Sequence, residues 1–159
     1  MEKPTENNNS AVQKVREITV VAAALLRPSP AVPQDEKPRW ELFIARRAPH
    51  DQGAGIWEFP GGKVERGESN EEALVREILE ELSVSIQIEK YLGQNDYFLT
   101  KEVLMHLHVY AALPRSQNMV LVDHDACEWH SLDTFPTEKI SAADQPFVAV
   151  LRTLILDVK

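Results

Sequence analysis

Residues 62–84 read GKVERGESNEEALVREILEELSV, and this stretch decides the fold. Ser69 followed by Glu72 forms a capping box, which defines where a helix starts and so sets its register. The pattern predicts a helix from Asn70 to about Leu82. An apolar stripe along that helix consists of Leu74, Ile78 and Leu82.

Three glutamates lie within one arc of this helix, beside the apolar stripe: Glu77, Glu80 and Glu81. Like charges at these spacings repel by about 0.2–0.5 kcal/mol per pair, and the neighbouring Arg76 offsets only part of that repulsion. A divalent cation satisfies such a cluster, and magnesium usually completes its shell with waters and substrate phosphates. The helix therefore indicates a phosphorylated substrate; the alternative is an acidic, solvated helix behind a glycine turn.

A glycine-rich loop precedes the helix. In its segment FPGGK, residues 59–63, the glycines let the backbone approach a ligand, and Lys63 can meet a phosphate as a point charge. Glu68 adds a further carboxylate at the entry to the helix. The loop and the helix together predict a site for a metal ion and a phosphate group.

Length and composition fit one domain. The chain has 159 residues, 43% of them hydrophobic, and we expect a polar tail at residues 1–16 followed by one domain at residues 17–159. Seventeen Lys and Arg against twenty-five Asp and Glu give a net charge of −8, which disfavours a stable complex with nucleic acid. The single cysteine, Cys127, cannot form an internal disulfide, and no apolar run reaches the roughly 20 residues that span a bilayer. These features predict a cytoplasmic protein that does not bind a membrane, and they leave its oligomeric state open.

The hydrophobic pattern predicts strands on both sides of the central helix. An apolar run begins at Ile18 and ends near Pro28, a stiff proline-rich loop follows, and residues 40–47 form a second strand in a hairpin with the first. Residues 84–99 and 102–113 continue as further strands. The predicted order is β, β, α, β, β, β, α, which indicates an α/β layered domain.

A final helix is predicted from the segment DQPFVAVLRTLIL at residues 144–156. Asp144 is a candidate N-cap and Pro146 fits the first turn. The face expected to be buried consists of Phe147, Val150, Leu151 and Leu154.

The 62–84 segment resembles the Nudix box, whose pattern is a glycine, five residues, Glu, seven residues, Arg-Glu, an aliphatic residue, any residue, Glu-Glu, any residue, a glycine and an aliphatic residue. Every constrained position but one matches. Ser83 stands where the family usually has glycine, at a position expected to end the helix in a left-handed conformation.

This resemblance to the Nudix hydrolase superfamily implies an α/β/α sandwich with a mixed β-sheet. It also implies a magnesium-dependent site, in which Mn²⁺ can substitute, where water activated by metal and a carboxylate attacks a bridging phosphate. Arg76 would orient Glu77 there. The implied metal-binding residues are Gly61, Glu68, Glu77, Glu80 and Glu81.

Beyond the box, the segments WEFPGGK and CEWHSLDTF resemble the MutT-type branch, whose members remove oxidised nucleoside triphosphates from the nucleotide pool. The likeness implies that Arg47 contacts the substrate phosphates and that a carboxylate six residues before a tryptophan serves as general base. Here that carboxylate is Asp123, shorter than the usual glutamate, so the base is either Asp123 or Glu80. Asp123 also fits a simple polar turn. Further implied phosphate or nucleotide contacts are Lys63, Gly62, Phe59 and Trp57.

Asp144 is the candidate base-reading residue, at a position where MutT-like enzymes can carry asparagine. An ionised aspartate only accepts hydrogen bonds, so it fits guanine N1 and N2 or the N4 amine of cytosine. The implied reaction converts a small-molecule nucleoside triphosphate, such as 8-oxo-dGTP, into a monophosphate and pyrophosphate. Alternatives are hydrolysis of CTP or modified pyrimidine nucleotides, removal of pyrophosphate from RNA 5′ ends, and a non-catalytic nucleotide sensor.

Four ring-bearing residues are left open by the sequence. His106 and His108 alternate along a predicted strand, a spacing that allows zinc binding, but ring packing is the simpler explanation because no third ligand is visible. Trp57 and Phe98 either stack on a base or belong to the core or the cleft wall.

Overall fold

The computed structural model describes residues 14–30 and 39–157. Most of the predicted tail and most of the proline-rich loop lie outside these described residues. The elements, in chain order, are β1 (Arg16–Pro28), β2 (Trp40–Arg47), β3 (Trp57–Glu58), β4 (Gly61–Lys63), α1 (Asn70–Leu82), β5 (Ile86–Thr100), β6 (Val103–Pro114), β7 (His124–Ser131), the short 3-10 helix η1 (Thr137–Lys139) and α2 (Gln145–Asp157). The predicted order agrees with this one except that it omits the short elements β3, β4 and η1.

Strand β1 runs through the centre of a mixed sheet. It pairs in parallel with β6, and antiparallel with β4 near its middle and with β2 at its end. β5 lies beyond β6, and β2 also pairs with β3 and β7, all antiparallel. The predicted mixed sheet and the predicted hairpin between β1 and β2 are confirmed. The register sets Ala22 opposite Gly61 and Val21 opposite Gly62, so β1 positions the glycine loop.

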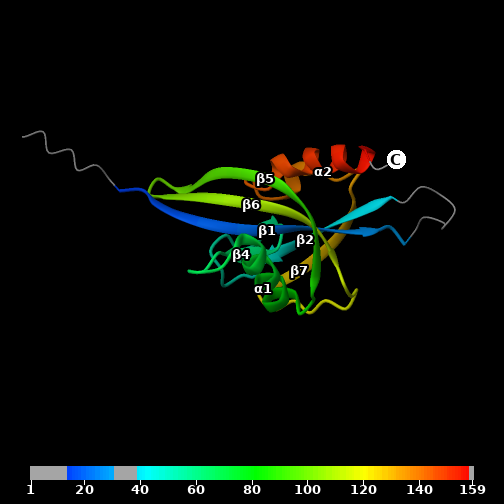
Figure 1. The fold of residues 1–159 in the computed structure, drawn as a ribbon, viewed down its shortest axis with the longest axis horizontal. Helices are drawn as coiled ribbons and strands as arrows, with labels where there is room; N and C mark the ends of the chain where they lie inside the picture. The colour runs from blue at the N-terminus through cyan, green and yellow to red at the C-terminus, as the bar shows by residue number, and fades with distance from the viewer. Residues whose placement is uncertain (1–13, 31–38, 158–159) are drawn as a thin grey trace, which may run out of the picture.

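Helices α1 and α2 cover opposite faces of the sheet (Figure 1). Strand β1 serves both faces, because successive side chains of a strand point to opposite sides. The core on the α1 side receives Val21, Ala23 and Leu25, and the core on the α2 side receives Ala22, Ala24 and Leu26. The predicted α/β/α sandwich is therefore confirmed. None of the helices that the structure describes has the length and apolar character of a bilayer-spanning segment.

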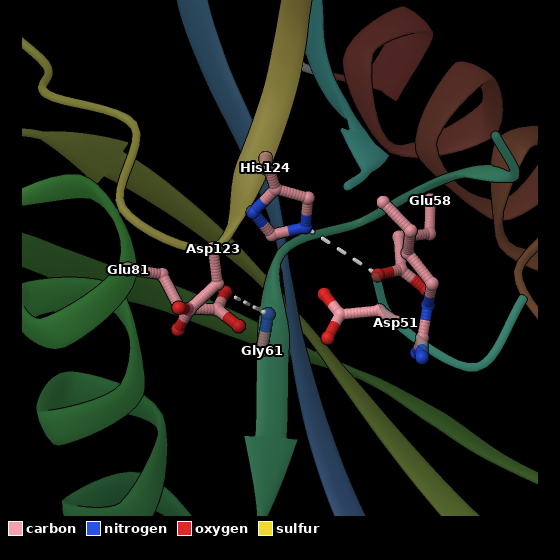
Figure 2. Close-up of a pocket in the computed structure, with 7 residues that line it drawn as sticks. Asp51, Glu58, Gly61, Glu81, Asp123 and His124 are labelled. Atoms are coloured by element: carbon pink, nitrogen blue, oxygen red, sulfur yellow. Dashed lines mark hydrogen bonds and ion pairs between the residues drawn. The ribbon is translucent and has the colours of Figure 1, made fainter. Parts of the chain in front are cut away.

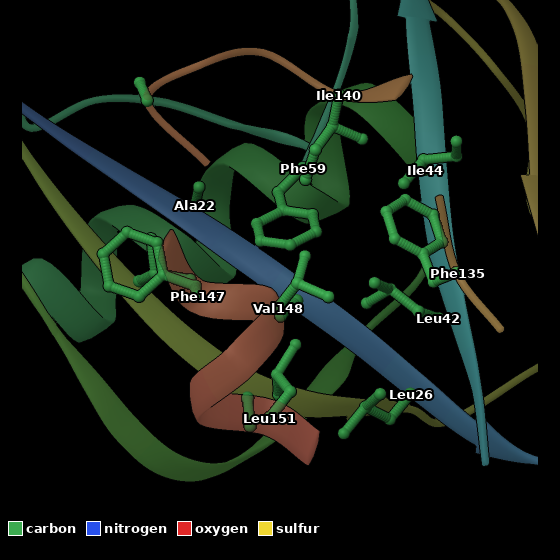
Figure 3. Close-up of a cluster of buried hydrophobic side chains, with 14 of the residues drawn as sticks. Ala22, Leu26, Leu42, Ile44, Phe59, Phe135, Ile140, Phe147, Val148 and Leu151 are labelled. Atoms are coloured by element: carbon green, nitrogen blue, oxygen red, sulfur yellow. The ribbon is translucent and has the colours of Figure 1, made fainter. Parts of the chain in front are cut away.

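The core under α2 corrects one sequence prediction (Figure 3). Phe147 and Leu151 are buried as expected, but Val150 is 38% exposed and Val148 is fully buried in its place. The apolar residues of α2 span a wide arc, and the sheet covers only the part that holds Phe147, Val148 and Leu151. Spacing alone does not determine which edge of a wide apolar arc will dock.

The predictions for α1 are confirmed at both of its ends. Ser69 Oγ accepts a hydrogen bond from the Glu72 N–H at 3.2 Å, and Glu72 Oε2 accepts one from the Ser69 N–H at 2.8 Å. Ser83 ends the helix in the left-handed conformation, with φ 53° and ψ 32°, and its N–H donates to the Leu79 carbonyl at 3.0 Å. The three residues of the apolar stripe are all 0% exposed: Leu74, Ile78 and Leu82.

Replacing Ser83 by glycine should stabilise the protein by about 0.5–1 kcal/mol, because glycine adopts the left-handed conformation without the steric cost of a Cβ. Ser83→Val should instead destabilise it by about 1 kcal/mol or more, since a β-branched residue fits that region worst. Urea unfolding followed by circular dichroism measures both free energies. Equal stability of the two variants would show that the left-handed cap carries no strain.

Candidate active site

The glycine loop and α1 meet in two close contacts. The Gly61 N–H donates to Oε2 of Glu81 at 3.1 Å. A Cβ added at Gly62 would lie 2.3 Å from the carboxyl carbon of Glu77, and one added at Gly61 would lie 2.0 Å from the carbonyl oxygen of Val21. Neither position has room for a side chain, so the glycine pair lets β4 lie between β1 and the acidic residues of α1.

Arg76 gathers three of the acidic side chains. Its Nε and Nη2 donate to the two carboxylate oxygens of Glu68 at 2.6 and 2.9 Å. Its Nη1 donates to Glu77 Oε1 at 2.9 Å and to Glu80 Oε2 at 3.3 Å. The hydrogen bonds from Arg76 and from the Glu65 N–H lower the pKa of Glu68 to about 2. Arg76 therefore orients Glu77, as expected, and holds Glu68 and Glu80 as well.

Glu81 is the acidic residue of the predicted metal site that Arg76 does not bind. Burial, together with the negative charges of Glu77 and Glu58, raises its pKa to about 7, against the opposing effects of His124 and the Gly61 N–H. A buried carboxylate whose ionised form is disfavoured is stabilised by a nearby cation. Glu81 is thus suited to contact a positive ion.

A cavity of about 240 Å³ opens beside Glu81 (Figure 2). It is lined by residues from the end of β2, the loop after it, β3, β4, α1, the loop before β7 and the start of β7: Arg47, Asp51, Glu58, Gly61, Glu81, Asp123 and His124. Four of these residues are carboxylates, and two carry basic side chains. A phosphate chain accompanied by divalent cations matches that mixture of charges.

Arg47 and His124 share one carboxylate in the cavity wall. Arg47 Nε donates to Glu58 Oε2 at 2.7 Å, and His124 Nε2 lies 3.4 Å from Glu58 Oε1. Burial lowers the pKa of His124, but the hydrogen bond to Glu58 and the charges of Glu81 and Glu58 outweigh burial and place that pKa above its ordinary value. Arg47 lies opposite His124 at a register shift between β2 and β7, an irregularity of the kind that re-aims side chains.

Asp144 lies directly before α2 and is 4% exposed. Its Oδ2 accepts hydrogen bonds from Ser141 Oγ at 2.7 Å and from the Phe59 N–H at 3.3 Å. Burial raises the pKa of Asp144 to about 7. Asp144 occupies the predicted N-cap position, where its carbonyl accepts from the Phe147 N–H at 3.1 Å, but its side chain bonds Phe59 and Ser141 in place of the first turn of α2.

The structure divides the predicted site residues into groups. The cavity wall holds Arg47, Gly61, Glu81 and Asp123. The adjoining Arg76 network holds Glu68, Arg76, Glu77 and Glu80. Gly62 packs against Glu77, and Lys63 is exposed next to it, with its carbonyl accepting from Arg76 at 3.1 Å.

The aromatic residues predicted to contact the nucleotide are not among those that line the cavity. The ring of Phe59 is 3% exposed within the core, so only its backbone reaches Asp144. The ring of Trp57 lies under two cations, with Arg46 at 5.6 Å and Lys139 at 4.7 Å from its centroid. Phe98 is 58% exposed, which rules out the core among the alternatives that the sequence left open for it.

His106 and His108 are satisfied by neighbouring side chains. His106 Nδ1 lies 2.8 Å from Asp96 Oδ1, and His106 Nε2 lies 3.3 Å from Glu17 Oε2. His108 Nδ1 lies 2.8 Å from the hydroxyl of Tyr91, whose ring stacks on the imidazole. Packing and hydrogen bonding therefore explain both histidines without zinc.

The acidic residues suit magnesium better than an ion that needs a complete protein cage. Across residues 14–30 and 39–157, no three His, Cys, Asp or Glu side chains converge on one point as a ready-made cation site. Magnesium does not need such a cage, because it is usually held by one or two carboxylates together with waters and substrate phosphates. Glu81, partly buried near Glu58 and Glu77, carries oxygen atoms of the hard type that such an ion prefers.

Three lining residues were missed by sequence reasoning: Asp51, Glu58 and His124. Glu58 and His124 are neighbours in sequence of Trp57 and Asp123, which the sequence had singled out. That adjacency was the only signal, because isolated charged residues carry no spacing that predicts a shared cavity.

Comparisons with known proteins agree with this geometry. The NUDIX domain family matches residues 25–151. A CTP pyrophosphohydrolase of Escherichia coli (strain K12) is 30% identical over 114 residues, covering 72% of this chain and 84% of that protein. An 8-oxo-dGTP diphosphatase of the same strain is 30% identical over 118 residues, covering 72% of this chain and 88% of that protein. The crystal structure of a MutT protein from Methanosarcina mazei Go1 superposes with a TM-score of 0.73 at 25% identity, over 91% of this chain and 99% of that chain.

The chain therefore belongs to the NUDIX domain family. It is a Nudix pyrophosphohydrolase, an enzyme of a class that acts on small-molecule nucleotides and generally uses divalent metal ions.

The two glycines of the loop should respond differently to alanine. Gly62→Ala should leave the fold intact but lower kcat/KM roughly tenfold to hundredfold, because the new methyl group displaces the flexible carboxylate of Glu77. Gly61→Ala should destabilise the protein by roughly 1–3 kcal/mol, since its methyl group meets the backbone of Val21. Urea unfolding and triphosphate turnover separate the two effects. Equal losses of stability in both variants would contradict this account.

The raised pKa of Glu81 predicts a pH-dependent stability. The folded protein holds this proton up to a pH of about 7, whereas an ordinary glutamate releases it near 4.5, so the associated stability is present below about pH 4.5 and is lost as pH rises towards 7. In EDTA, Glu81→Gln should therefore melt above the wild type at pH 8 and level with it near pH 4.5. Magnesium should raise the melting temperature of the wild type at pH 8, where the carboxylate is ionised, and not that of the variant. A difference in melting temperature between the two proteins that is the same at pH 4.5 and pH 8 would contradict the raised pKa of Glu81.

Proposed function

We propose that this enzyme hydrolyses nucleoside 5′-triphosphates to monophosphates and pyrophosphate, with oxidised nucleotides such as 8-oxo-dGTP as its substrates. One observation carries the proposal. The cavity has Glu81 and Asp123 on one side and Glu58, which binds Arg47, on the other (Figure 2). A phosphate chain between them has metal-binding carboxylates at one end and a guanidinium at the other. The proposal includes a cytoplasmic location, where the nucleotide pool lies.

Magnesium, with manganese as a substitute, is proposed to bind at Glu77, Glu80 and Glu81, supported by Glu68 and the backbone of Gly61. Gly61 contributes directly to the geometry, because its N–H fixes one oxygen of Glu81. When bound, the metal would neutralise charge on the phosphate oxygens and acidify a water molecule. Arg76 would keep the acidic side chains apart and oriented.

Asp123 is proposed as the general base. It lines the cavity with Glu81, whereas the side chain of Glu80 is 59% exposed and hydrogen-bonded to Arg76. The water oxygen bonds to a phosphorus of the chain while its proton passes to the Asp123 carboxylate. The bridging P–O bond then breaks, and pyrophosphate leaves with the electron pair. Arg47 would bind the phosphate oxygens from the opposite wall, with Lys63 nearby.

Asp144 is proposed to read the base. Both hydrogen bonds to this carboxylate fall on Oδ2, so Oδ1 is the oxygen available for a base edge. In its ionised form it accepts from guanine N1 and N2 or from the cytosine N4 amine. A second candidate substrate class is therefore CTP and modified pyrimidine nucleotides, favoured by the 30% identity to a CTP pyrophosphohydrolase.

A substrate panel tests this proposal. Pyrophosphate release with magnesium should give the highest kcat/KM for 8-oxo-dGTP among 8-oxo-dGTP, dGTP, CTP, 5-substituted dCTP and triphosphate-ended RNA. Asp144→Asn should change the ratio of purine to pyrimidine turnover about tenfold or more, because an amide donates as well as accepts. Asp133→Asn, which alters an exposed aspartate, is the matched control and should leave that ratio unchanged.

The outcomes of this panel test the proposed reaction and the proposed substrate separately. No turnover of any triphosphate would overturn the proposed reaction. Preference for a cytosine nucleotide or for RNA would keep the reaction and replace the proposed role in removing oxidised nucleotides.

A further inference from the structure

His124 carries an unexplained buried atom. Its side chain is 3% exposed, and Nε2 lies 3.4 Å from Glu58. Its other ring nitrogen, Nδ1, is buried and has no hydrogen-bond partner among the residues that the structure describes. Buried polar atoms in folded proteins are nearly always hydrogen-bonded, so a buried nitrogen in a cavity wall indicates a partner that binds from the cavity.

The direction of the ring identifies where that partner lies. Figure 2 shows Nε2 directed at Glu58, and Nδ1 on the side of the ring that faces Glu81 and Asp123. All four residues line the same cavity. The buried Nδ1 therefore lies on the side of the ring towards the metal carboxylate Glu81 and the proposed base Asp123.

We propose that His124 is a catalytic-site residue whose Nδ1 atom donates a hydrogen bond to an oxygen of the bound phosphate chain, while Glu58 holds the ring through Nε2. The inference rests on the proposed function. Phosphate oxygens and the Glu58 carboxylate both only accept hydrogen bonds, so each ring nitrogen carries a hydrogen when His124 makes the two contacts together. Glu58 also binds Nε of Arg47 at 2.7 Å, so one carboxylate positions two phosphate donors side by side.

A histidine with only a structural role here would need one ring nitrogen and not both. Tying β7 to Glu58 requires Nε2 alone, and it leaves a buried Nδ1 unsatisfied. His130, on the same strand, provides the comparison, because its Nε2 contacts Glu128 and the residue lies outside the cavity lining. His124 therefore differs from His130 in that it lines the cavity.

Two conservative substitutions separate the two ring nitrogens. The amide nitrogen of asparagine is as many bonds from Cα as Nδ1, and that of glutamine is as many bonds from Cα as Nε2. His124→Asn therefore keeps a donor for the phosphate, whereas His124→Gln keeps only the contact with Glu58. His130→Asn and His130→Gln are the matched controls. The readouts are the Kd for inorganic pyrophosphate with magnesium by calorimetry, kcat/KM for a triphosphate, and the melting temperature.

We expect His124→Asn to stay within about threefold of wild type in pyrophosphate Kd and kcat/KM, and His124→Gln to lose roughly tenfold to hundredfold in both, the range for a lost hydrogen bond to a charged group. The His130 variants should match wild type. Wild-type constants in His124→Gln together with a loss in His124→Asn would overturn the proposal, because that result would mean that His124 only holds Glu58 in place. Wild-type constants in both His124 variants would overturn it as well.

A measurement on the unaltered protein covers the case in which the variants fold poorly. In ¹⁵N-histidine NMR spectra, magnesium pyrophosphate should shift the Nδ1 resonance of His124 more than its Nε2 resonance. An unchanged Nδ1 resonance at saturating pyrophosphate would refute the contact. If the wild type hydrolyses no triphosphate, the proposed function fails, and this spectrum still tests whether His124 binds a phosphate chain.

Discussion

The close packing of helix α1 against the Gly61–Gly62 pair is the constraint on which the rest of the structure depends. The Val21 carbonyl lies on one side of the loop, and the carboxylates of Glu77 and Glu81 lie on the other. A side chain at Gly61 would force the backbones of β1 and β4 apart, and one at Gly62 would displace the carboxylate of Glu77. Because β1 is also the central strand of the sheet, the same contact ties the acidic helix to the core of the domain.

Charge is distributed unevenly over helix α1 and the glycine loop that packs against it. Arg76 binds Glu68, Glu77 and Glu80, whereas Glu81 lies partly buried at the edge of the cavity with a raised pKa. The repulsion expected among the acidic residues of the helix is thus concentrated on one carboxylate. Such an arrangement leaves a favourable place for a cation beside Glu81.

Local interactions explain why the helix was predictable and much of the cavity was not. The capping box joins Ser69 to Glu72, three residues apart, and the left-handed end of the helix is confined to Ser83. By contrast, Glu58 and His124 are 66 residues apart and meet only because β2 pairs with both β3 and β7. Sequence spacing does not predict a contact between residues so far apart in the chain.

The sequence by itself determined the acidic helix, its ends, its buried stripe, the glycine pair and the alternation that gives β1 two buried faces, because each depends on residues within a few positions of one another. The tertiary structure decided which residues line the cavity, which edge of α2 is buried, and that the Asp144 side chain binds Phe59 and Ser141 in place of capping its helix. These features depend on how the strands pair and on what each helix docks against. Both are settled by burying apolar surface across the whole domain, which no short segment encodes.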